Sequence, residues 1–153
     1  MKKKTNLLTA FIMMFLFIPS TAAGMGSSEK RMPDIKAEAS FNYKEKKAAL
    51  TIFIEKTPNE VKSLGFDLGY DPAVLKYSGY KKGQIIQNFT MFDAHRIKAG
   101  LIRAGGFHAG NSRISGKKGE LITFHFDSIN KGNPEIKIIN LTDDISSWKV
   151  EIE

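Results

Sequence analysis

The chain has 153 residues, a formal net charge of +7 and no cysteine. This length suits a single domain, and without cysteine the chain has no disulfide bond, no thiol nucleophile and no lipid-modified N-terminal cysteine. Beyond the lysines at positions 2–4, many basic residues stand beside acidic ones, as in residues 44–47 and 117–120. This pattern is typical of a solvated surface, and we expect no nucleic-acid partner.

The first 23 residues have the composition of a secretory signal peptide. Consecutive lysines at positions 2–4 precede an apolar run at residues 7–18, and small residues up to Ala23 follow it. A membrane span needs roughly 20 apolar residues, which this run does not reach, so we expect no permanent span. We predict export with cleavage after Ala23, with retention as an uncleaved anchor as the alternative. The mature protein is then secreted, periplasmic or on the cell surface.

Residues 24–33 are predicted to form a flexible lead-in, and residues 34–153 a single β-sandwich domain. In this part short apolar runs alternate with turn residues about every ten positions, which is typical of an antiparallel sandwich or barrel. The clearest run places Leu64, Phe66 and Leu68 on one face of a half-buried strand. No long segment has helical periodicity. The expected strands are residues 35–43, 48–55, 64–70, 74–80, 88–95, 100–107, 120–128, 135–141 and 148–152.

The sequence contains no recognised catalytic or metal-binding pattern. There is no Gly-x-Ser-x-Gly motif, and the three histidines, His95, His108 and His125, share no metal-ligand spacing. We therefore predict no catalytic residue, no metal, no cofactor and no enzymatic activity. Aromatic residues that could stack on a sugar are few. Tyr77 and Tyr80 are three positions apart and are expected on opposite faces of their strand, and Trp148 lies in the last one.

An ordered series of motifs begins in the third expected strand. Residues 64–77 read Leu-Gly-Phe-Asp-Leu-Gly-Tyr-Asp-Pro-Ala-Val-Leu-Lys-Tyr, an alternating strand that ends in a Tyr-Asp-Pro turn and leads into the next strand. Gly83, Phe89 and residues 100–106, 119–126 and 141–144 follow in order. This order and spacing resembles the cohesin domain over residues 34–153.

The resemblance implies a two-sheet jelly-roll β-sandwich of about nine strands. It also implies a non-catalytic module that binds a dockerin, a protein module with calcium-loop repeats. In that family the dockerin lies on one flat sheet, which contains the third, fifth, sixth and eighth strands. Matched to this sequence, that sheet is predicted from residues 64–70, 88–95, 100–107 and 120–128.

The predicted partner-binding residues are outward-facing positions of these strands. Arg103 cannot face an apolar core, so Leu101 and Gly105 face outward with it. Glycines keep the face flat, and Leu101 supplies an apolar anchor, which suits a protein helix better than a small molecule. The predicted residues are Ser63, Gly65, Asp67, Leu101, Arg103, Thr123 and His125.

Three other interpretations stay open at this point. The first is a carbohydrate-binding module that uses Tyr77, Tyr80 or Trp148 on an extracellular polysaccharide. The second is a structural subunit of a surface assembly. The third is an ordinary solvated sheet with one exposed leucine. The leading prediction is an exported module that binds a dockerin or another extracellular protein.

Overall fold

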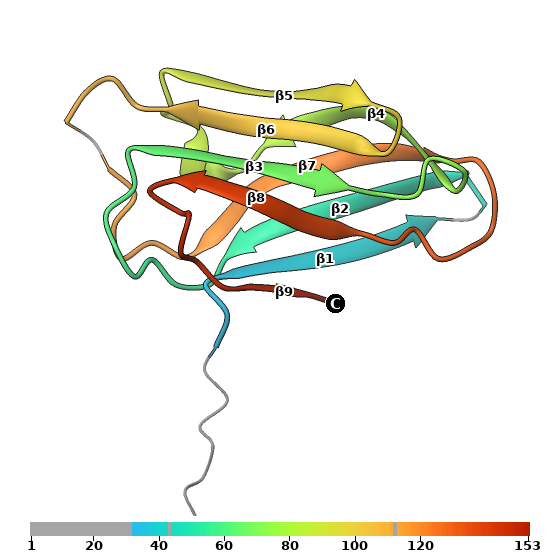
Figure 1. Ribbon diagram of the computed structural model, residues 1–153, viewed down its shortest axis with the longest axis horizontal. Helices are drawn as coiled ribbons and strands as arrows, with labels where there is room; N and C mark the ends of the chain where they lie inside the picture. Colours follow the sequence, from blue (N-terminus) through green and yellow to red (C-terminus); the bar gives the residue numbers. More distant parts are fainter. Residues whose placement is uncertain (1–31, 43, 112) are drawn as a thin grey trace, which may run out of the picture. The chain divides into compact units, whose positions relative to one another are not determined.

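The computed structural model describes residues 32–42, 44–111 and 113–153, so the predicted signal peptide lies outside the described residues. Nine strands form two sheets that pack face to face (Figure 1). Within the described part of the chain, no helix is long and apolar enough to cross a membrane. The strands are β1 (Ile35–Asn42), β2 (Lys47–Ile54), β3 (Ser63–Gly69), β4 (Leu75–Lys82), β5 (Met91–Lys98), β6 (Leu101–Phe107), β7 (Gly119–Ser128), β8 (Lys137–Asp143) and β9 (Val150–Ile152).

The expected strands all exist, and the predicted jelly-roll sandwich is confirmed. Every observed end lies within three residues of its predicted position. The larger sheet has the order β4-β7-β2-β1-β9 and the smaller sheet the order β5-β6-β3-β8. The pairing is antiparallel except between β1 and β9. A short 3-10 helix, η1 (Gln84–Ile86), was not expected.

A single hydrophobic core lies between the two sheets and stabilises the fold without disulfide bonds. In β7 the alternation brings Ile122, Phe124 and Phe126 into the interior. The ring of Phe124 meets Phe66 of the opposite sheet edge-on, with centroids 6.2 Å apart. Burial of each large apolar side chain contributes roughly 1.5–3 kcal/mol.

The turn after β3 forms as the sequence predicts. The Asp71 carboxylate Oδ1 accepts the backbone N–H of Ala73 at 2.8 Å, while the N–H of Asp71 donates to the Pro134 carbonyl at 2.7 Å. The turn between β5 and β6 needs glycine for a conformational reason, because Gly100 has φ +77°. The Tyr70 N–H donates to the Gly100 carbonyl at 3.0 Å and so joins the turn after β3 to the turn between β5 and β6. The ends of β3 and β5 and the start of β6 therefore lie on the same side of the domain.

One prediction about the sheets is wrong. Residues 120–128 were placed in the sheet of residues 64–70, but they form β7, which pairs with β2 and β4 in the larger sheet. The strand that actually flanks β3 is β8. Alternation within a strand shows which side is buried, but it does not show which sheet the strand joins.

A second correction concerns Tyr77 and Tyr80, which were expected on opposite faces of β4. The pairing of β4 with β7 shifts by one residue between Tyr77 and Gly79, which is a β-bulge. Both rings therefore turn to the interior, where Tyr77 contacts Phe124 and Phe126 and Tyr80 contacts Phe92.

Candidate functional site

The candidate site is the outer face, by which we mean the side of the smaller sheet that is turned away from the core. Its middle row crosses all four strands of that sheet. Gly105 of β6 lies opposite Asp93 of β5 and Gly65 of β3, and Gly65 lies opposite Thr142 of β8. Two adjacent glycines without side chains expose the backbone and flatten the sheet at this point.

An ion pair between the exposed Arg103 and the buried Asp67 lies beside the glycine row. Arg103 donates from Nε to Asp67 Oδ1 at 2.8 Å and from Nη2 to Oδ2 at 3.0 Å, and Asn140 Nδ2 donates to Oδ2 at 2.9 Å. The Asp67 side chain is 3% exposed, whereas that of Arg103 is 59% exposed. The Arg103 guanidinium, helped by Asn140, holds the pKa of Asp67 below its usual range. The pair fixes the Arg103 side chain across β3.

A depression of about 670 Å³, here called the hollow, opens above the two glycines. A methyl group on Gly65 would lie 2.5 Å from Thr142 Oγ1, and one on Gly105 would lie 2.9 Å from the Leu64 carbonyl oxygen. The contact at Gly105 is with backbone, so glycine is required there, whereas the contact at Gly65 is with an exposed side chain that can rotate. The hollow lies where both strands lack a side chain. Its outward lining residues are Ser63, Gly65, Asp67, Arg103, Gly105, Phe107, Asn140, Thr142 and Asp143.

Large apolar side chains are exposed around the hollow. Met91 and Phe107 are direct cross-strand partners on β5 and β6, with exposures of 61% and 43%. Ile139 of β8, opposite Asp67, is 42% exposed. Leu101 is half-buried at the other end of β6. Exposed apolar groups with a polar network between them are typical of a surface that binds a protein.

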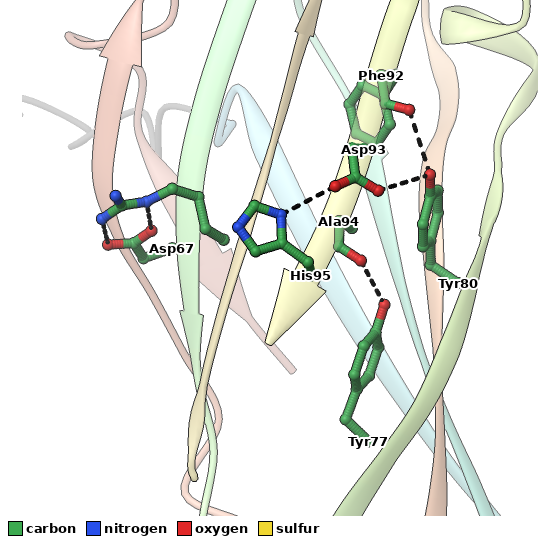
Figure 2. Close-up of polar contacts among 8 residues, drawn as sticks. Asp67, Tyr77, Tyr80, Phe92, Asp93, Ala94 and His95 are labelled. Atoms are coloured by element: carbon green, nitrogen blue, oxygen red, sulfur yellow. Dashed lines mark hydrogen bonds and ion pairs between the residues drawn. The ribbon is translucent and has the colours of Figure 1, made fainter. Parts of the chain in front are cut away.

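A polar cluster on β5 links the smaller sheet to β4 (Figure 2). Asp93 lies between His95, whose Nδ1 is 2.9 Å from Asp93 Oδ2, and Tyr80, whose hydroxyl also donates to the Phe92 carbonyl at 3.2 Å. The Tyr77 hydroxyl donates to the Ala94 carbonyl at 2.8 Å. Burial raises the pKa of Tyr77 to about 12. Both tyrosines thereby hold the edge strand β5 in place.

The structure brings five of the predicted residues together and separates two. Ser63, Gly65, Asp67, Leu101 and Arg103 all lie on β3 or β6 and share the outer face. Thr123 and His125 lie on β7 of the larger sheet, where the Thr123 and Thr51 hydroxyls are 3.0 Å apart. They face away from the hollow because the inward residues of β7 point into the same core from the other side.

Sequence reasoning missed the contributions of β5 and β8. Met91 and Phe92 are both apolar, so the alternation of that segment was ambiguous, although Asp93 and His95 at i+2 spacing mark the outward side. In β8 the pairing shifts between Gly65 and Asp67, which conceals the outward positions. The missed outward residues of these two strands are Met91, Asp93, His95, Ile139, Asn140, Thr142 and Asp143. Phe107, at the end of β6, was also missed.

The described residues of the outer face form neither a metal site nor a platform of the aromatic residues considered for sugar stacking. Among the described residues, no group of three histidine or carboxylate side chains is placed to hold a metal ion. The aromatic residues considered for sugar stacking are elsewhere: Trp148 is buried and donates from Nε1 to Asn59 Oδ1 at 2.6 Å. What the face offers is a flat sheet with a hollow, a rigid ion pair and exposed apolar side chains.

Comparison with known proteins gives the family. The family model described as the cohesin domain matches residues 36–147. A cohesin of scaffoldin B from Acetivibrio cellulolyticus, solved in complex with a dockerin, is 13% identical with a TM-score of 0.62 over 79% of this chain and 94% of that one.

A cohesin from Clostridium acetobutylicum is 14% identical with a TM-score of 0.60, over 79% of this chain and 86% of that one. A non-cellulosomal cohesin from Archaeoglobus fulgidus is 20% identical with a TM-score of 0.53, over 78% and 86%. None of the curated protein sequences compared with the chain matches it. At these identities the structures show the fold, whereas the family match spans most of the chain. The chain belongs to the cohesin family.

Proposed function

We propose that the chain is an exported, non-catalytic module that binds a dockerin on the outer face of its smaller sheet. The family match and the structural neighbours that were solved with dockerins support this role. Export is supported by the basic and apolar N-terminal segment of the sequence.

The observation that carries the proposal is the placement of exposed apolar side chains. Met91, Phe107 and Ile139 all lie on the outer face, within reach of the glycine row. The outward side of β7 and β2, by contrast, carries polar pairs such as Lys47 with Asp127. A partner that covers the outer face removes apolar surface from water, which is the main favourable contribution to association.

Isothermal titration calorimetry with dockerin modules encoded in the same genome, in calcium and in chelator, tests the proposal. Truncation of an anchor at Phe107 or Met91 to alanine is expected to cost about 1–3 kcal/mol of binding free energy. His125→Ala on the larger sheet is the matched control and is expected to leave the affinity unchanged. Absence of binding to every dockerin would contradict the proposal.

The carbohydrate-binding alternative makes a different prediction. A sugar site would need exposed rings, but Tyr77 and Tyr80 contact the core and Trp148 is buried. Retention on cellulose or chitin that is lost in Tyr77→Ala, Tyr80→Ala or Trp148→Ala, with these variants still folded, would favour that alternative.

A further inference from the structure

The hollow carries one negative charge that the described residues do not neutralise. Three charged residues line it: Asp67, Arg103 and Asp143. Asp67 and Arg103 form a bidentate pair and neutralise each other. The Asp143 carboxylate remains, on a chain whose formal net charge is +7. The hollow is therefore a local exception to the basic character of the protein.

Asp143 holds its carboxylate over the floor of the hollow. Its Oδ2 lies 3.8 Å from the point where a methyl group on Gly65 would be. Among the described residues its carboxylate has one polar contact, the Thr142 hydroxyl, which donates at 3.4 Å. The neighbouring Asp144 differs, because its Oδ2 accepts the backbone N–H groups of Lys62 and Ser63 at 2.8 and 3.0 Å. Asp144 is satisfied inside the protein, and Asp143 is available to a partner.

The walls of the hollow suit a long side chain with an apolar stem. The floor is the bare backbone of Gly65 and Gly105, and the ring of Phe107 stands at one end. Lysine and arginine side chains combine an apolar stem with a cationic head. The stem can pack on the glycines and Phe107 while the head reaches the Asp143 carboxylate, a geometry that forms a charge-assisted hydrogen bond.

We propose that the hollow receives a lysine or arginine side chain of the bound dockerin, with Asp143 as its counter-charge and specificity determinant. This inference rests on the proposed dockerin binding. It adds to it a chemical requirement on the partner: a basic residue on the surface that meets β3 and β8. Dockerins with an acidic or apolar residue at that place are bound more weakly.

Asp143→Asn is a clean test because asparagine keeps the shape and also tolerates the left-handed backbone at this position, where φ is +56°. The affinity for the tightest-binding dockerin should fall about tenfold, the size of one hydrogen bond to a charged group. The affinity should also depend less on salt between about 50 and 500 mM NaCl. Asp127→Asn on the larger sheet is the matched control and should leave the affinity unchanged.

A double-mutant cycle identifies the partner residue. Alanine variants of each lysine and arginine of the dockerin are titrated against the wild-type chain and against Asp143→Asn. One of them should lose affinity against the wild type and show no further loss against Asp143→Asn. This result supports the inference.

Two results overturn it and are distinguishable. If a dockerin binds but Asp143→Asn binds it as tightly as the wild type, while Phe107→Ala weakens binding, the hollow receives an apolar group and only this inference fails. If no dockerin binds, the proposed function fails and takes the inference with it. Thermal unfolding of Asp143→Asn shows whether the variant is folded. A folded variant ensures that any change in affinity comes from the lost charge.

Discussion

Arg103 and Asp67 give a quantitative test of the outer face, because one partner is buried and the other is not. Arg103→Ala removes the two hydrogen bonds at 2.8 and 3.0 Å and leaves a carboxylate that is 3% exposed with only the Asn140 amide. A hydrogen bond to a charged group contributes about 1.5–3 kcal/mol. Because the Arg103 side chain is 59% exposed, solvent screens the pair and water can replace part of what is lost.

We therefore expect Arg103→Ala to lower the free energy of unfolding by about 2–3 kcal/mol. For a domain of this size this corresponds to a fall in Tm of roughly 6–12 °C. Differential scanning calorimetry at pH 7 measures it. The control is Arg113→Ala, which removes an exposed ion pair with Glu60 and should cost at most about 1 kcal/mol. Equal losses in the two variants would refute the reasoning that burial of Asp67 makes this pair stabilising.

Three further predictions follow from named contacts. The pKa of Asp67 is depressed below 3.8 in the folded state, so its contribution is complete above that value and is lost as pH falls through the folded pKa. The difference in free energy of unfolding between wild type and Asp67→Asn, measured by urea unfolding, should thus be constant from about pH 5 to 8 and shrink below about pH 4. A difference that stays constant in acid would contradict this. Phe124→Ala, at a fully buried position, should cost about 3–5 kcal/mol by the same assay, and a loss below about 1 kcal/mol would show that the core is misassigned. Leu101→Ala should weaken dockerin binding measured by calorimetry by about 1–3 kcal/mol, whereas Thr123→Ala should not; the reverse order would restore the larger sheet as the binding surface.

The fold was predictable from the sequence because local patterns, the alternation of apolar residues and the turn residues between them, indicate where the strands lie. The strict alternation at Leu64, Phe66 and Leu68 predicts β3, and Asp71 with Pro72 predicts the turn that ends it. Arg103 could be placed outward on physical grounds alone, since a guanidinium does not face an apolar core.

The candidate site was predictable only in part because it depends on contacts that are distant in the sequence. Placing Thr123 and His125 correctly requires knowing that β7 pairs with β2 and β4, which is decided by tertiary packing. The burial of Asp67 likewise depends on Arg103 and Asn140, which are 36 and 73 positions away. The bulge in β4 reverses the alternation, so that Tyr77 and Tyr80 face the same side.

The most direct test of the central claim is a hydrogen-exchange footprint of the chain with and without a bound dockerin. We predict slower exchange of backbone amides in β3, β5, β6 and β8 when the dockerin is bound, with the strongest protection around Gly65 and Gly105. Amides of β1, β2, β4 and β7 should exchange as in the free chain. Protection centred on β7 and its residues Thr123 and His125, with the outer face unchanged, would contradict it.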